Sequence, residues 1–198
     1  MKQNFKNYEI VLANPGESLP DDVLNWQGDY LISYLCPWVI PKTVLESANI
    51  ACINFHPAPP NYPGSGCTNF ALYNNEKLYG VTCHYMAEEV DSGKIVDVKR
   101  FEVFDTDTVY SVTQRCYAYM LTLFYEIMTM IKLNKTLPES KEKWTRKAYR
   151  YKDLQALKKI EPDMDKDEVK RRIRAVTYPG YDGAYIELHG ERFDLKTK

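Results

Sequence analysis

The chain has 198 residues, and its 26 lysines and arginines nearly balance 27 aspartates and glutamates, so its formal net charge at pH 7 is −1. This balance excludes the overall basic field of a general nucleic-acid binder, and the length suits one α/β domain with a small addition. Its five cysteines are scattered, odd in number and without a Cys-x-x-Cys pair, which favours reduced thiols and a cytoplasmic location.

At the start of the chain, residues 1–6 have no apolar core of a signal peptide. Further on, β-branched apolar runs predict strands, and segments opened by proline or an N-cap predict helices. The expected strands are 8–13, 29–35, 50–55, 78–86 and 94–103. The expected helices are 21–26, 41–48, 67–74 and 109–133, the last capped from within 105–108. This alternation predicts an α/β fold with a mainly parallel sheet and helices on both faces.

The apolar part of the longest helix, 116–131, contains Glu126 and is short for a membrane span, so it predicts a buried helix. Beyond residue 138 the chain becomes charged and aromatic. A helix is expected at 165–176, with Asp165 as its cap and one apolar face. Two short strands, 184–188 and 192–195, are expected to form a hairpin with His189 in its turn.

Side chains suited to acyl transfer gather near the expected strand ends. Asn54 and His56 are two residues apart, so both project to the same side, and Pro57 ends that strand. Thr82 and His84 repeat this spacing in the next strand. Ligands of open α/β sheets usually bind at such strand ends.

A carboxylate, Asp91, follows in the turn 88–93. An amide can hold a developing oxyanion, an imidazole can carry a proton, and a carboxylate can set the charge of that imidazole. Taken alone, His56 reads as a structural residue and Asp91 as a turn former. Together with Asn54 they predict an enzyme.

The motifs Asn54-Phe55-His56-Pro57, Gly80-Val81-Thr82-Cys83-His84 and Asp91-Ser92-Gly93-Lys94-Ile95 resemble one family in their order and spacing. It is the family of formyltransferases that use N10-formyltetrahydrofolate, which includes glycinamide ribonucleotide transformylase, methionyl-tRNA formyltransferase and the sugar N-formyltransferases. The likeness covers about residues 29–135, and 174–185 more weakly resembles the C-terminal part of sugar N-formyltransferases. The resemblance implies a Rossmann-like sheet with a shortened N-terminus, because little precedes residue 29.

The resemblance also implies the roles of individual residues. Asn54 would donate to the formyl oxygen, and His56 would assist there and in proton transfer. Asp91 would hold His56 in the useful protonation state and relay the proton of the amine. Thr82 and His84 would support this group. Folate contacts would come from Ser33, Tyr34, Leu35, Cys36, Trp38, Ile40, Glu88 and Val90. The family needs no metal and no covalent nucleophile.

On this basis we divide the chain into a formyltransferase catalytic domain, 1–137, and a small C-terminal α+β appendage for substrate or dimer contacts, 138–198. The likeness favours a nucleotide-linked amino sugar as the acceptor and a homodimer as the assembly. Tail aromatics such as Trp144 and Tyr149 could stack on a base or pack the appendage. Two alternatives stay open: another amine such as methionyl-tRNA, and an inactive folate-binding regulatory protein.

Overall fold

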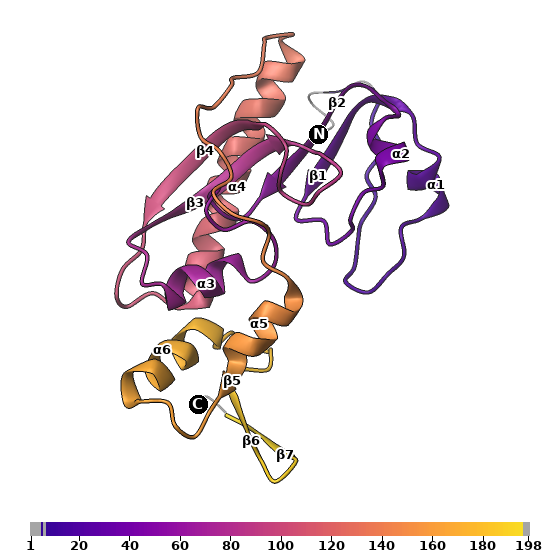
Figure 1. Cartoon of the computed structure of the whole chain (residues 1–198). Coiled ribbons are helices and arrows are strands. Elements are labelled where there is room, and N and C mark those ends of the chain that lie inside the picture. The colour runs from indigo at the N-terminus through magenta and orange to yellow at the C-terminus, as the bar shows by residue number, and fades with distance from the viewer. Residues whose placement is uncertain (1–4, 6, 196–198) are drawn as a thin grey trace.

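The structure, a computed structural model, describes Phe5 and residues 7–195 (Figure 1). Of residues 1–6, which were assessed above for a signal peptide, only Phe5 is among the described residues. Four strands form the main sheet in the order β1-β2-β3-β4. They are β1 (Gly28–Tyr34), β2 (Ala48–His56), β3 (Leu78–Tyr85) and β4 (Ile95–Glu102).

The α/β fold is confirmed, but the sheet is mixed and not mainly parallel. β1 and β2 run parallel, whereas β2 with β3 and β3 with β4 run antiparallel. The connection 86–94 between β3 and β4 is shorter than the dozen or more residues that a parallel crossover needs, which explains the last pairing.

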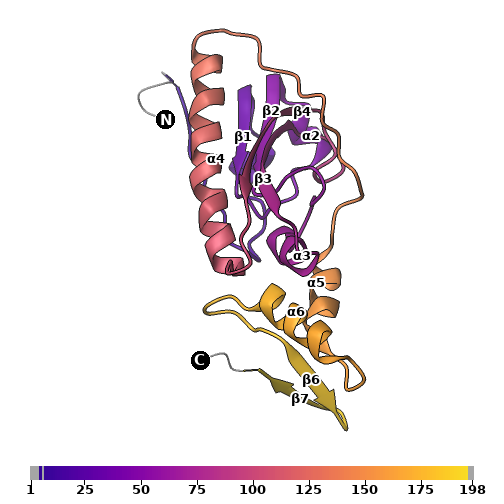
Figure 2. The ribbon, with the colours of Figure 1, turned by 90° about the vertical axis from the view of Figure 1, so that its left-hand side faces the viewer.

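Helices α1 (Asp21–Leu24), α2 (Lys42–Leu45) and α3 (Cys67–Tyr73) are short, and α4 (Val109–Lys132) is long. Thr108 begins α4 through a capping box with Ser111. α4 lies along one face of the sheet, and α2 lies on the other side (Figure 2). Buried residues of α4 recur every three or four positions, so one stripe of the helix packs on the sheet.

The strand expected at 8–13 is wrong. This segment is extended but belongs to no strand, and Ile10 and Leu12 are 59% and 82% exposed. An apolar run forms a strand only where a partner supplies ladder hydrogen bonds, and none does so here among the described residues.

After α4, residues 134–150 form a return segment that runs down the side of the sheet opposite α4 (Figure 2). It leads to α5 (Tyr151–Lys158), β5 (Lys159–Ile160), α6 (Lys166–Val176), β6 (Tyr185–Leu188) and β7 (Glu191–Asp194). Asp165 caps α6 as predicted, and the hairpin β6–β7 forms with β5 a second sheet. The helix α5 was not expected from the sequence.

The C-terminal elements share a core with the main sheet. α6 packs on α3, where the Asn69 side chain donates to the Ala175 carbonyl at 2.7 Å and Tyr73 donates to Glu168 at 2.9 Å. The buried cluster behind the sheet continues into Leu157 and Ala184. Within the described part of the chain, no helix is long and apolar enough to cross a membrane.

Candidate active site

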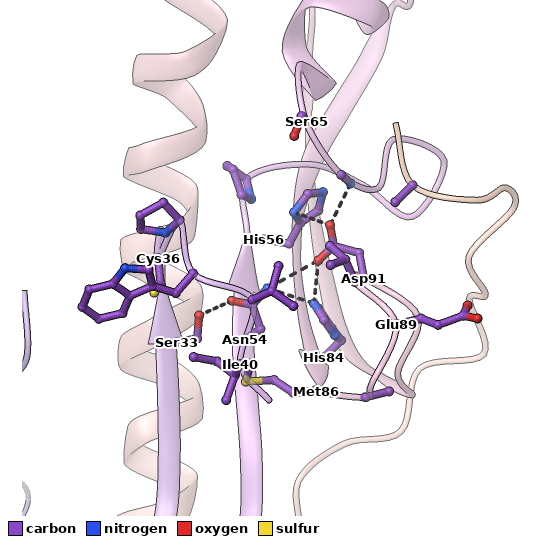
Figure 3. A pocket seen from close by; sticks show the side chains of 18 of the residues that line it. Ser33, Cys36, Ile40, Asn54, His56, Ser65, His84, Met86, Glu89 and Asp91 are labelled. Carbon is purple, nitrogen blue, oxygen red and sulfur yellow. Dashed lines mark hydrogen bonds and ion pairs between the residues drawn. The ribbon is translucent and has the colours of Figure 1, made fainter. Parts of the chain in front are cut away.

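The register of the antiparallel pair β2–β3 assembles the polar centre of the site. Asn54 lies opposite His84, and His56 lies opposite Thr82. Neighbours on one face of such a pair have their side chains in contact range. The i, i+2 spacing of each pair therefore brings both imidazoles and the amide to one place, as Figure 3 shows.

Asp91 joins this centre from the turn after β3. Its Oδ2 lies 3.2 Å from His56 Nδ1 and accepts from the Gly64 amide at 2.7 Å. Its Oδ1 lies 3.2 Å from His84 Nε2 and 3.5 Å from Asn54 Nδ2. Asp91 is a non-glycine residue with a φ of 47°, a backbone conformation that costs free energy and is common at functional sites.

Backbone carbonyls determine where the imidazoles carry protons. His56 Nε2 lies 2.9 Å from the Tyr62 carbonyl, and His84 Nδ1 lies 2.8 Å from the Tyr85 carbonyl. A carbonyl only accepts, so each of these nitrogens carries its proton. The His56 Nδ1 atom is consequently the one that shares or exchanges a proton with Asp91.

The loop that provides the Tyr62 carbonyl is itself anchored. The Tyr62 hydroxyl donates to Glu76 at 2.7 Å and accepts from the Asn74 amide at 2.9 Å. Thr82, fully buried, donates to the Ala58 carbonyl at 2.7 Å. Thr82 therefore holds the proline loop and is not among the cavity-lining residues.

Burial and charge act in opposite directions on the central pair. Burial lowers the pKa of His56, while Asp91 and the Tyr62 carbonyl raise it and only partly offset that effect. Burial by itself raises the pKa of Asp91, but His56, His84 and the Gly64 amide overcome this and lower it to about 2. Asp91 is therefore a carboxylate at neutral pH.

Ser33 orients the amide of Asn54. The Ser33 hydroxyl donates to Asn54 Oδ1 at 2.7 Å, so Nδ2 points to the other side, where it lies 3.0 Å from His84 Nε2. Asp91 Oδ1 lies 3.5 Å from the same Nδ2 and 3.2 Å from His84 Nε2. Asn54 lines the cavity, so its amide is within reach of a ligand oxygen there.

A cavity of about 550 Å³ opens over this centre. Its walls come from the loop after β1, the turn after β3 and the start of α5. The lining includes seven of the eight predicted folate contacts: Ser33, Leu35, Cys36, Trp38, Ile40, Glu88 and Val90. In this size range a cavity suits a small-molecule ligand.

Tyr34 is the exception, because it does not line this cavity. Adjacent strand residues point to opposite faces, so Tyr34 turns away from Ser33 and packs instead on Phe55 and Phe124. The ring centroids are 5.9 Å and 5.5 Å apart. Tyr34 belongs to the core between β1 and α4.

Residues 7–126 match the formyl transferase family. This match covers more than half of the chain and contains the whole polar centre. The chain belongs to the formyl transferase family. It is 27% identical over 168 residues to GDP-perosamine N-formyltransferase of Brucella melitensis, a match that covers 84% of this chain and 64% of that enzyme. The chain thus spans less than two thirds of this curated relative.

Solved structures have the same fold. A sugar N-formyltransferase from Shewanella superposes with a TM-score of 0.74 at 24% identity, covering 85% of this chain and 69% of that one. An N-formyltransferase from Helicobacter canadensis, solved with folinic acid and dTDP-3-aminofucose, superposes with a TM-score of 0.64 at 21% identity. It covers 80% of this chain and 58% of that one.

For this family member, sequence reasoning missed two groups that contact the polar centre. Gly64 donates its amide to Asp91, and its φ of +87° and a Cβ position only 2.2 Å from the Tyr149 carbonyl require glycine there. Trp144 lies against both imidazoles, with ring centroids 5.9 Å from His56 and 4.9 Å from His84. The Pro63-Gly64 pair was a signal for a special turn, whereas nothing local to Trp144 pointed to the site.

The other tail aromatics are largely committed to packing. Tyr149 stacks on Phe70 at 3.7 Å, and the Arg146 guanidinium covers Tyr149 with a distance of 3.3 Å to the ring centroid. Tyr178 packs on Tyr110 at 5.7 Å. Tyr149 therefore has no free face for a base, and packing accounts for it.

The described residues contain no group of three or more His, Cys, Asp or Glu side chains arranged to hold a metal ion. The polar contacts among Asn54, His56, His84 and Asp91 are hydrogen bonds and ion pairs within the protein. The arrangement offers an oxyanion donor, a proton carrier and a fixed carboxylate at the floor of one cavity.

Proposed function

We propose that this chain transfers a formyl group from N10-formyltetrahydrofolate to a primary amine. The observation that carries the proposal is the convergence of Asn54, His56 and Asp91 at the floor of a single cavity. In this proposal they are the catalytic residues, and Thr82 and His84 support them. The cavity residues named above, without Tyr34, provide the folate contacts.

The reaction balances without a covalent enzyme intermediate. The nitrogen of the amine attacks the formyl carbon, and the side-chain amide of Asn54 donates to the oxygen that becomes negative. The amine loses a proton toward Asp91 and His56, and the bond from the formyl carbon to N10 breaks. The proton finishes on N10, so the products are a formamide and tetrahydrofolate.

The cavity suits a folate. Apolar side chains such as Leu35, Trp38, Ile40 and Val90 can cover the flat pterin and linker, while the polar centre lies at its floor. The relative from Helicobacter canadensis was solved with folinic acid, a formylated folate. This supports a formyl folate as co-substrate here.

For the acceptor we favour an amino sugar carried on a nucleotide. One structural relative, from Shewanella, is a sugar N-formyltransferase, and another, from Helicobacter canadensis, was solved with dTDP-3-aminofucose. A curated relative, from Brucella melitensis, is a GDP-perosamine N-formyltransferase. Arg150 and Tyr151 lie at the cavity wall with exposed side chains. A guanidinium and an aromatic ring are suited to a diphosphate and a base.

The division at residue 137/138 into a catalytic domain and an appendage remains part of this proposal, as does the homodimer. The appendage supplies the wall with Arg150 and Tyr151, which fits a role in acceptor binding. Cross-linking and light scattering of the full chain would test the dimer.

The proposal is tested by formyl transfer from N10-formyltetrahydrofolate to a panel of nucleotide-linked amino sugars and to methionyl-tRNA, read by mass spectrometry. His56→Ala is compared with His189→Ala, which changes an exposed histidine in the distant β6–β7 turn. Gain of one formyl group on one acceptor, lost only in His56→Ala, is the expected result. Folate binding without a product on any amine would support the inactive binding protein instead.

A further inference from the structure

The return segment has one side chain that reaches the polar centre. Residues 141–147 are exposed except Trp144, which is half-buried. Its indole lies against His84 at 4.9 Å with the rings nearly perpendicular, and against His56 at 5.9 Å. A half-buried side chain from an otherwise exposed stretch thus packs on both imidazoles of the site.

Trp144 contacts the histidines away from the ligand cavity. It is not among the cavity-lining residues, whereas His56 and His84 are. The indole therefore covers the back of the imidazoles, where water would otherwise reach them. Substrates approach from the other side.

A hydrogen bond fixes the indole in this place. Trp144 Nε1 donates to the Gly93 carbonyl at 2.7 Å. Gly93 in turn packs on the Tyr85 carbonyl so closely that a Cβ would lie 1.8 Å from it. Because Tyr85 is the acceptor of His84 Nδ1, the indole, the turn and the imidazole form one continuous contact.

We infer that Trp144 is a positioning residue, which holds His56 and His84 in their working orientations and keeps water from their rear face. The inference rests on the proposed formyl transfer for its role in catalysis. Its structural part, the shielding of His56, does not depend on that reaction.

Four elements packed around His56 each contribute one group that faces its imidazole. Asp91 comes from the turn after β3, His84 from β3, the Tyr62 carbonyl from the proline loop, and Trp144 from the return segment. Burial is the largest influence on His56 and lowers its pKa. Removing the indole admits water and weakens that influence, so the titration of His56 moves back toward the ordinary value of 6.5.

The experiment compares Trp144→Leu and Trp144→Phe with Trp26→Leu, a matched change remote from the site. The Cε1–H resonances of the three histidines are followed by NMR across the pH range in which imidazoles titrate, with His189 as internal reference. In Trp144→Leu the His56 midpoint is expected to rise, with a smaller rise in Trp144→Phe, which keeps a ring but loses the bond to Gly93. Trp26→Leu should leave the His56 midpoint unchanged.

Kinetics form the second arm. Trp144→Leu is expected to lower kcat by about 10- to 100-fold, as misplacement of a catalytic group does, with little change in KM for the folate. Should the wild type transfer no formyl group, the proposed function fails and the NMR arm still decides the position of Trp144. An unchanged His56 midpoint in folded Trp144→Leu overturns the inference. Should that variant not fold, an unchanged midpoint and kcat in Trp144→Phe overturns it.

Discussion

Asn54 and His84 face each other across β2 and β3, and the Nδ2 and Nε2 atoms of their side chains lie 3.0 Å apart. The Tyr85 carbonyl holds a proton on Nδ1 of His84, so Nε2 is the ring atom that faces both the Asn54 amide and Asp91 Oδ1, the latter at 3.2 Å. A residue of β3 thus lies directly against the amide of a β2 residue. This pairing links the strand register directly to the proposed oxyanion site.

Asn54→Ala removes the proposed oxyanion donor. Loss of one such donor typically costs about 100- to 1000-fold in rate, so we expect a fall of that order in kcat. Single-turnover formyl transfer, with folate binding measured in parallel, checks it. An unchanged rate would remove Asn54 from the mechanism.

Ser33→Ala leaves Asn54 in place but frees its amide to rotate, because the 2.7 Å bond to Oδ1 is lost. We expect a fall in kcat smaller than the roughly 100-fold that loss of the donor itself costs. The double variant with Asn54→Ala should be no slower than Asn54→Ala alone. Additive losses would show that Ser33 acts independently of the amide.

Gly93→Ala places a Cβ 1.8 Å from the Tyr85 carbonyl, so the turn that carries Asp91 must shift. We expect a loss of about 1–3 kcal/mol in the free energy of unfolding, together with lower activity. Gly183→Ala is the matched control, since its Cβ would meet only the Leu195 carbonyl at an ordinary 3.8 Å. Chemical denaturation of both variants provides the comparison, and equal stability would contradict the contact.

Acid should destabilise the protein through the central pair. The pKa of Asp91 is lowered from 3.8 to about 2, so its contribution, on the order of 2 kcal/mol, is present above pH 3.8 and lost as the pH falls toward 2. The pKa of His56 is lowered from 6.5, so its contribution is also complete above that value and declines below it. Both signs agree.

Urea unfolding at a series of pH values measures this dependence. In Asp91→Asn the part of the slope below pH 3.8 should flatten, because the titrating carboxyl is gone. A wild-type stability that rises on acidification through this range would contradict the assignment.

Much of the fold followed from local patterns. The strands β1 to β4, the long helix α4 and the capped helix α6 were all predicted, because apolar periodicity and caps act over a few residues. The segment 8–13 has the composition of a strand but finds no pairing partner within Phe5 and residues 7–195, because partners are set by tertiary contacts. The direction of β3 and β4 was likewise decided by how the chain turns.

Within the site, the sequence by itself singled out Asn54, His56 and Asp91, because residue type and spacing along the chain can be read locally. Only the tertiary structure decided which atoms meet: the cross-strand register set Asn54 against His84, and the strand pleat turned Tyr34 away from the cavity. The return segment brought Trp144, more than fifty residues beyond His84, onto the imidazoles. Such contacts depend on packing over the whole chain, and no local pattern encodes them.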